Sequence, residues 1–291
     1  MLSMGVLEAG FFGVFGLLIG SFLNVVIYRL PKMMERQWAI ECAQVNGVEP
    51  SPSEAPFNLI SPRSACPHCG HQIRWHENVP VLSFLALRGN CSSCGAPIGW
   101  RYPAVELVTA ALFVIVYCHH GATPAAVAWA AFASLLVVQF LIDFDTQLLP
   151  DDVNYPLLWG GLIAAATGLS TAPLRSAVWG AIWGYLSLWM VFHVYRILTG
   201  KEGFGYGDFK LLAGLGAWFG GEYLIAIILL SSIVGSLIGG VMLLVGKLAH
   251  KNIPIPFGPY LAGAGLLAMA VGPAQLMAWV PFAFPFAGLA H

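Results

Sequence analysis

Charged residues are scarce in this sequence of 291 residues: they make up 9% of it, against 58% for hydrophobic residues, and the mean hydropathy is +0.76. Soluble domains carry about 25% charged residues, so this composition excludes an ordinary soluble protein. The net charge of −1 and the lack of a basic run argue against a nucleic-acid partner. The sequence also lacks a serine-hydrolase elbow, a nucleotide-binding loop, an HExxH motif and a glycine-rich Rossmann fingerprint. Most of the surface is therefore expected to face a lipid bilayer.

The first apolar segment, residues 5–28, is either a retained membrane span or a cleaved signal peptide. No basic region precedes it, and Tyr28-Arg29-Leu30-Pro31 follows it in place of a small-residue cleavage site. We therefore expect a retained signal-anchor span, with a cleaved signal peptide as the alternative.

The apolar pattern breaks after residue 28 and resumes at residue 103. Because a helix needs about 20 apolar residues to cross a bilayer, we expect spans at 5–28, 103–118, 123–142, 153–169, 175–198, 208–220, 222–246 and 257–279. The segment 208–220 is short, which leaves one span fewer as the alternative. The predicted fold is an all-α polytopic membrane protein with about eight transmembrane helices and one small soluble domain between the first two spans.

Basic residues indicate the orientation. If the eight spans cross the membrane in alternating directions, the connections 29–102, 143–152, 199–207 and 247–256 lie on one side. Every Lys and Arg except Arg175 lies in these connections or near the span ends that border them. The positive-inside rule makes that side cytoplasmic and places both termini outside. We thus expect a first transmembrane helix at 1–28, a cytoplasmic domain at 29–102 and a transmembrane domain at 103–291. Within the cytoplasmic domain, the proline-containing segment 36–60 is expected to be a poorly structured insert.

Two CxxC pairs lie in the cytoplasmic domain, at Cys66 and Cys69 and at Cys91 and Cys94. Each pair lets two thiolates reach one ion from a tight turn, and this spacing closely matches a four-cysteine zinc ribbon. Disulfides and redox-active thiols are the alternatives, but a reducing cytoplasm disfavours lasting disulfides. With four protein ligands and no open position, the zinc would be structural.

Acidic residues near the membrane edge are the candidates for catalysis. Asp143, Asp145, Asp151 and Asp152 lie in one cytoplasmic connection, and Asp208 opens another after Gly205-Tyr206-Gly207. An ionisable group at the membrane edge is costly to desolvate and is often functional. Two carboxylates in a partly desolvated site could share the work of an aspartic protease, one holding a proton and the other activating water. Spacing alone does not name the pair, because aspartates in loops often cap helices, as Asp151 after Pro150 could.

Six motifs together resemble the type IV prepilin peptidase family, in order and over residues from about 10 to 265. They are Gly20-Ser21-Phe22-Leu23-Asn24-Val25-Val26-Ile27-Tyr28-Arg29-Leu30-Pro31, the paired CxxC, Arg101-Tyr102-Pro103-Ala104-Val105-Glu106, Asp143-Phe144-Asp145 with Leu149-Pro150-Asp151, Gly205-Tyr206-Gly207-Asp208-Phe209-Lys210 and Pro256-Phe257-Gly258-Pro259.

The resemblance implies a membrane-embedded aspartic endopeptidase of the GxGD type in the bacterial inner membrane, with its active site facing the cytoplasm and both termini in the periplasm. Such an enzyme removes the leader of type IV prepilins and type II secretion pseudopilins after glycine, and N-methylates the new terminal residue with S-adenosylmethionine. The family's catalytic pair corresponds to Asp143 and Asp208. Its methyl-transfer region includes a glycine that corresponds to Gly89.

Two readings from other classes remain as alternatives to an enzyme. A polytopic transporter with a zinc domain would place acids at mid-membrane rather than at the edge. A non-catalytic assembly factor would keep the spans and the zinc domain without the two aspartates, but both Asp143 and Asp208 are present.

Overall fold

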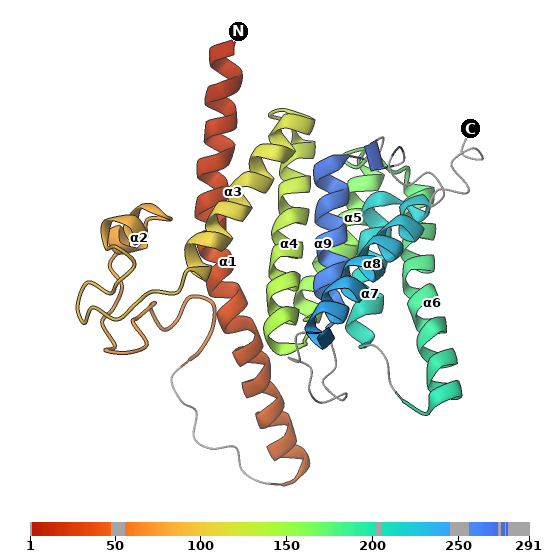
Figure 1. The fold of residues 1–291 in the computed structure, drawn as a ribbon, viewed down its shortest axis with the longest axis horizontal. Helices are drawn as coiled ribbons and strands as arrows, with labels where there is room; N and C mark the ends of the chain where they lie inside the picture. The colour runs from red at the N-terminus through yellow and green to blue at the C-terminus, as the bar shows by residue number, and fades with distance from the viewer. Residues whose placement is uncertain are drawn as a thin grey trace. The chain divides into compact units, whose positions relative to one another are not determined.

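A computed structural model of the chain describes residues 2–47, 56–201, 205–244, 256–272, 275, 276 and 278. It divides into two compact units, Met1–Tyr117 and Cys118–His291. The described residues form helices and loops, with two isolated β-bridges but no strand (Figure 1). The predicted all-α fold is therefore confirmed over this part of the chain.

The first unit is built on two long helices, α1 (Leu2–Val45) and α3 (Arg101–His120), with the short elements η1 (Trp75–Asn78) and α2 (Leu82–Ala86) between them. Glycines on α1 let the two helices approach closely. A Cβ atom added at Gly16 would lie 2.7 Å from Cα of Ala110, and one added at Gly20 would lie 2.7 Å from Cα of Glu106. Small residues four apart are a common basis for close packing between membrane helices.

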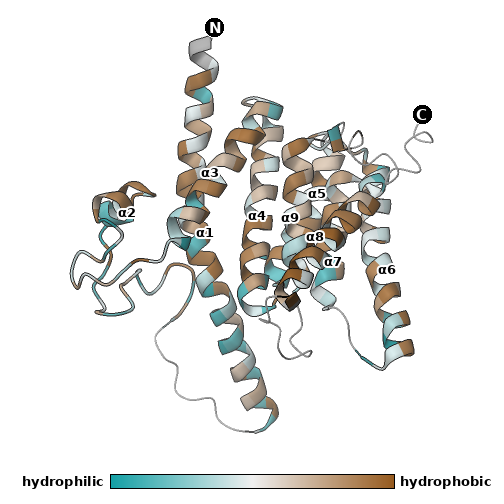
Figure 2. Cartoon of the chain, in the orientation of Figure 1, coloured by the Kyte–Doolittle hydropathy of each residue, from teal (hydrophilic) through white to brown (hydrophobic). Residues whose placement is uncertain are grey.

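Helix α1 is longer than the predicted span 5–28, because it continues to Val45 with Pro31 inside it. At 44 residues it would extend about 66 Å, roughly twice the thickness of the hydrocarbon core. Its C-terminal part is more hydrophilic than the rest (Figure 2). Proline removes one helical hydrogen bond, but this did not end the helix here.

The expectation of a poorly structured insert at 36–60 is wrong over two parts of that segment. Residues 36–45 belong to α1. Residues 57–62 are attached to the same helix, because the buried guanidinium of Arg29 donates hydrogen bonds to the carbonyl oxygens of Asn58 at 2.8 Å and Pro62 at 2.6 Å. The side chain of Asn58 also accepts hydrogen bonds from the backbone of Ile60 and Ser61. Residues 48–55 lie outside the described residues.

The second unit is a bundle of α4 (Pro124–Thr146), α5 (Asp151–Ala166), α6 (Leu174–Thr199), α7 (Tyr206–Phe219), η2 (Gly221–Tyr223), α8 (Leu224–Leu244) and α9 (Gly258–Val271). Helix α7 lies at its centre, with buried residues at nearly every position from Asp208 to Phe219. It packs mainly against α6 and α5. Gly180 of α6 and Gly216 of α7 touch backbone to backbone, so the contact admits no side chain at either position.

Each of the eight predicted spans contains a described helix, but the count of eight membrane spans is not confirmed. Among the described residues, five helices are long and apolar enough to cross a membrane: Gly5–Val45, Arg101–His120, Pro124–Thr146, Leu174–Thr199 and Gly221–Met242. Helices α5, α7 and α9 have 16, 14 and 14 residues, which corresponds to about 21–24 Å, against the ~30 Å of a hydrocarbon core. Residues 245–246 and most of 273–279 of the predicted spans lie outside the described residues.

Candidate active site and metal centre

The four cysteines of the two CxxC pairs come together in the first unit. Their sulfur atoms all lie within 4.8 Å of one another, and Sγ of Cys66 is 3.9 Å from Sγ of Cys94. All of them are free thiols, which disfavours the disulfide alternative. Backbone N–H groups of Cys69 and His68 point at the sulfur of Cys66 and lower the pKa of its thiol to about 7. At Cys66 this favours the thiolate form that metal binding requires, whereas the neighbouring cysteine sulfurs raise the pKa of Cys94 to about 11.

The two cysteine turns repeat one another in detail. Gly70 and Gly95, which follow the pairs, have φ of 71° and 70°, a conformation that glycine adopts without strain. Their N–H groups donate to the carbonyl oxygens of Cys66 and Cys91, at 2.9 and 3.0 Å. Each turn is closed by one β-bridge, Ala65–Gln72 or Asn90–Pro97. The two halves thus present their thiols in the same way.

Glu77, in η1, links the two turns. Hydrogen bonds from the side chain of Ser92 and the backbone N–H of Arg74, together with the nearby His71, lower the pKa of Glu77 to about 2. Its Oε2 atom lies 3.2 Å from Nε2 of His71. Since His71 follows the first turn and Ser92 lies inside the second, this carboxylate ties the two halves together around the sulfur cluster.

The second unit holds the two predicted catalytic acids. Asp143 lies in the last turn of α4 and Asp208 is the third residue of α7. Both are buried, with 4% and 6% of their surface exposed. The two side chains are close enough for the charge of Asp143 to act on Asp208. The sequence placed these acids in separate connections, and the structure brings them together.

Each of the two carboxylates keeps one oxygen available. Oδ2 of Asp208 accepts a hydrogen bond from the backbone N–H of Gly205 at 3.1 Å, and the backbone N–H of Gly258, at the start of α9, faces the carboxylate of Asp143. Oδ2 of Asp143 and Oδ1 of Asp208 are buried without a hydrogen-bond partner among the described residues. Buried polar atoms are normally paired, so a pair of orphaned carboxylate oxygens points to a ligand such as water or a substrate group.

Leu149 fills the space beside both carboxylates. A Cβ atom added at Gly207, next to Asp208, would lie 2.5 Å from Cβ of Leu149. One added at Gly258 would lie 3.1 Å from Cδ1 of Leu149 and 2.5 Å from Oδ2 of Asp143. Both glycines are therefore required for close packing, and Leu149 is the common neighbour of the two acid-bearing segments.

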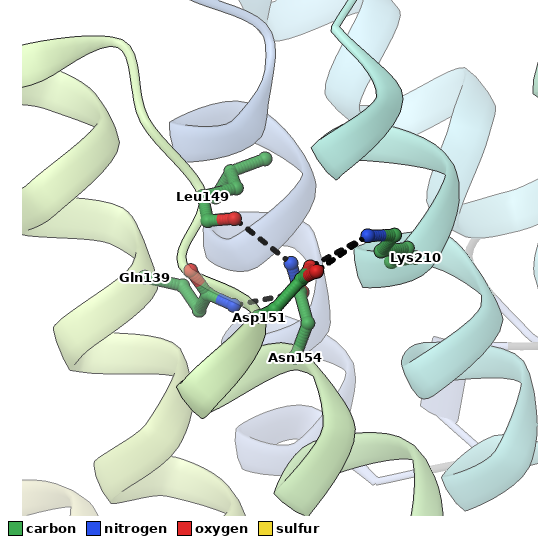
Figure 3. Close-up of polar contacts among 5 residues, drawn as sticks. All are labelled: Gln139, Leu149, Asp151, Asn154 and Lys210. Carbon is green, nitrogen blue, oxygen red and sulfur yellow. Dashed lines mark hydrogen bonds and ion pairs between the residues drawn. The ribbon is translucent and has the colours of Figure 1, made fainter. Parts of the chain in front are cut away.

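A buried polar network holds Leu149 in place (Figure 3). Nε2 of Gln139, one turn before Asp143 on α4, donates to Oδ1 of Asn154 at 2.7 Å. The amide nitrogen of Asn154 donates in turn to the carbonyl oxygen of Leu149 at 3.2 Å. Gln139 and Asn154 are fully buried. The network therefore couples α4 and α5 one helical turn before Asp143.

The remaining acids have other surroundings. Asp151 is the first residue of α5 rather than its cap, a position that Pro150 takes. Both oxygens of Asp151 pair with Nζ of Lys210, at 2.7 and 2.8 Å, which ties α5 to α7 (Figure 3). Asp145 and Asp152 are exposed. Burial thus separates Asp143 and Asp208 from the other three candidates.

Gly89, the candidate methyl-transfer residue, lies in the turn that leads to the third cysteine. Its φ is 71°, and its N–H donates to the carbonyl oxygen of Phe84 at 2.8 Å. A Cβ atom added there would lie 3.1 Å from the Phe84 ring. Gly89 therefore affects its surroundings through Phe84 and through its backbone conformation.

Sequence reasoning missed the network residues Gln139 and Asn154. One signal was present, because Gln139 is the single polar residue in the apolar run 135–142, where an unpaired amide would be costly. Lys210 and Leu149 lie within the motifs that carry the family resemblance, but the sequence pattern alone indicates a role for neither.

Comparisons with known proteins agree with this division of sites. Residues 14–120 match the bacterial Peptidase A24 N-terminal domain, and residues 130–240 match the type IV leader peptidase family. The first match contains the four cysteines and the second contains Asp143 and Asp208.

Curated relatives match over most of the chain, and each is named prepilin leader peptidase/N-methyltransferase. The protein from Pseudomonas aeruginosa is 54% identical over 273 residues, 92% of each chain. That from Aeromonas hydrophila is 51% identical over 89% of each chain, and that from Burkholderia pseudomallei is 46% identical over 91% of this chain and 86% of the relative. No solved structure matches the chain at a significant level.

Proposed function

The chain belongs to the type IV leader peptidase family, and we propose that it removes the leaders of type IV prepilins and type II secretion pseudopilins after glycine and then N-methylates the new N-terminal residue. It is an aspartic endopeptidase and N-methyltransferase. The observation that carries the proteolytic part is the pair of buried carboxylates, Asp143 and Asp208, each with one oxygen that has no partner among the described residues.

Cleavage proceeds by acid–base catalysis at this pair. Two carboxylates that act on one another in a buried site share a proton, because both cannot ionise easily. The ionised carboxylate takes a proton from water as the water attacks the peptide carbonyl, and the protonated one donates to the departing amine. Gly205 keeps the approach to Asp208 open, because a Cβ atom added there would meet only Asp208 and Gly207 within 4 Å, so an extended peptide can lie beside Asp208.

The substrate reaches the site from the membrane. The multiple apolar helices of this chain fit a membrane protein. The distribution of basic residues supports a cytoplasmic position for the edge that carries Asp143 and Asp208, with both termini on the other side. The family resemblance implies that this membrane is the bacterial inner membrane. The apolar helix of a prepilin lies in the bilayer, and its leader emerges at the same edge. The helix must unwind there, since a protease attacks an extended peptide.

The four-cysteine cluster fits zinc. Tetrahedral Zn–S bonds of about 2.3 Å would separate the sulfurs by about 3.8 Å. The four sulfurs here all lie within 4.8 Å of one another, and those of Cys66 and Cys94 are 3.9 Å apart. Cys66, Cys69, Cys91 and Cys94 would hold the ion, which supplies folding energy to the domain. S-adenosylmethionine supplies the methyl group for the second activity, which we place in the first unit because the family resemblance assigns methyl transfer to the region that contains Gly89.

The product masses test the proposed function. The purified protein in detergent, incubated with a full-length prepilin, is expected to release the leader, and adding S-adenosylmethionine should increase the mass of the mature product by one methyl group. Mass spectrometry resolves both changes. An intact prepilin after long incubation would instead support a transporter or a non-catalytic assembly factor.

Removing the metal should affect the two activities unequally. About one zinc ion per chain is expected to copurify, and Cys66→Ser combined with Cys91→Ser should remove it. Loss of a closed structural site removes folding energy from the small domain, so methylation should be lost while cleavage is at least partly retained. Elemental analysis and product masses measure these effects.

Cys42→Ser combined with Cys118→Ser is the matched control, because these two cysteines lie outside the cluster. It should keep zinc and both activities. Full methylation by a zinc-free protein would contradict the structural role of the ion.

A further inference from the structure

Four charged side chains are buried in the described part of the chain: Arg29, Glu106, Asp143 and Asp208. Asp143 and Asp208 belong to the proteolytic pair, and the guanidinium of Arg29 donates hydrogen bonds to two carbonyl oxygens. Glu106, on α3, is 7% exposed and has no part in any of these. A buried carboxylate is costly unless something compensates its charge, so Glu106 requires an explanation.

Glu106 lines a cavity of about 350 Å³ that lies within the first unit. The walls come from α1, from α3 and from the cysteine-bearing segment between them, and include Ser21, Tyr28, Phe84 and Tyr102. This volume lies at the lower end of the range of about 300–1,000 Å³ for small-molecule sites. The cavity is therefore large enough for one apolar residue with a polar end group.

The surroundings of Glu106 leave its charge uncompensated. Its Oε2 accepts a hydrogen bond from the backbone N–H of Val81 at 2.8 Å, and the hydroxyl of Ser21 also bonds to the carboxylate. No basic side chain of the described residues forms an ion pair with it. Two neutral donors hold the carboxylate in place and leave it to attract a positive group.

We propose that this cavity binds the amino terminus of the mature pilin for methylation, with Glu106 accepting a hydrogen bond from its α-ammonium group. The inference rests on the proposed function, which supplies a newly exposed amine with an apolar first residue. Rings of Tyr28, Phe84 and Tyr102 provide the apolar walls that such a residue needs. The carboxylate provides the charge that selects a free amine.

The position of Glu106 beside the amino terminus also suits it to assist methyl transfer. The ammonium must lose a proton before its nitrogen can attack the methyl group of the sulfonium donor, and the carboxylate of Glu106 is positioned to accept it. The nitrogen lone pair forms the new N–C bond, and the C–S bond breaks with its electron pair remaining on sulfur. The proton then passes from the carboxylate to water.

Peptide binding without methyl donor tests the proposal directly. The full chain in nanodiscs is titrated with a synthetic peptide that begins with the mature apolar residue, and with the same peptide N-acetylated. The wild-type protein should prefer the free amine by about tenfold or more, the effect of a hydrogen bond to a charged group. Glu106→Gln, which keeps an acceptor for Val81 but loses the charge, should abolish this preference, and Glu106→Asp should retain part of it.

Glu8→Gln is the matched control, since Glu8 accepts a hydrogen bond from Tyr117 on the same two helices and does not line the cavity. It should bind the peptide as the wild type does. Glu106→Gln should still cleave prepilin and retain zinc, while its methylation rate should fall by about a hundredfold or more.

Three outcomes would overturn the proposal. Glu106→Gln could retain the preference for the free amine, methylate at the wild-type rate, or lose binding of radiolabelled S-adenosylmethionine while binding the peptide normally. The last result would assign the carboxylate to the ammonium group of the donor instead. A wild-type protein that neither cleaves nor methylates would count against the proposed function itself, so the two failures are distinguishable.

Discussion

Asp143→Asn and Asp208→Asn should each abolish leader cleavage, reducing the rate by about 10²–10⁴-fold or more. One carboxyl must accept a proton from water and the other must donate one, and an amide does neither at this site. The substitution preserves size and shape, so the loss would report chemistry rather than packing. Cleavage of a full-length prepilin, followed by the mass of the product, measures the effect.

The folded state should tolerate these two substitutions well. Removing one of two buried acids that act on each other relieves repulsion and desolvation. The thermal midpoint of either variant is therefore expected to equal or exceed that of the wild type, as measured by a fluorescence melt in detergent. A variant that is inactive because it is unfolded would show the opposite change.

The exposed neighbours provide the control. Asp145→Asn and Asp152→Asn remove the same charge from the same connection, but both residues are exposed, and cleavage should stay within a few-fold of the wild type. If Asp145→Asn is inactive and Asp143→Asn cleaves normally, the assignment of the pair is wrong.

Gly89→Trp should abolish methylation while leaving leader cleavage intact. A side chain at this position would lie against the ring of Phe84, and Phe84 lines the cavity of the first unit. The positive φ of Gly89 adds a backbone cost of roughly 1–2 kcal/mol for any other residue. Mature but unmethylated pilin should accumulate, because Asp143 and Asp208 lie in the second unit.

Gly47→Trp is the matched control for this substitution. Gly47 has a similar φ of 66°, but an added Cβ would meet nothing within 4 Å, so only the backbone cost is shared. It should methylate normally. Loss of cleavage together with methylation in Gly89→Trp, at full zinc content, would indicate that the two sites share residues.

Local patterns were the most predictable from the sequence. The two CxxC turns depend on a few adjacent residues and on Gly70 and Gly95, so their geometry follows from short-range chain stereochemistry. A described helix also lies in each of the eight predicted segments, because apolar runs identify buried or lipid-facing helices. Their number as membrane spans was less certain, since helices such as α7 are apolar because they are buried in protein, and composition does not distinguish the two cases.

Long-range relations were harder to predict. Five acids lay in two connections, and spacing did not show which two would meet; the structure buries Asp143 and Asp208 together and exposes Asp145 and Asp152. The partnership of Gln139 with Asn154 joins residues on different helices, and no periodicity indicates it. Helix α1 exceeded its predicted end because residues 32–45 are polar enough to resemble a loop, although the helix continues through them.

Leu149 occupies space next to two glycines of the second unit, Gly207 and Gly258. Gly207 and Gly258 belong to different helices, but a side chain added at either would contact Leu149. The three positions therefore compete for the same space. Enlarging either glycine and shortening Leu149 should therefore be non-additive, with the double substitution less harmful than the two single effects predict. Over evolutionary time Leu149, Gly207 and Gly258 would be constrained to change together. The combined volume of these three residues would then stay constant and preserve the distance between Asp143 and Asp208.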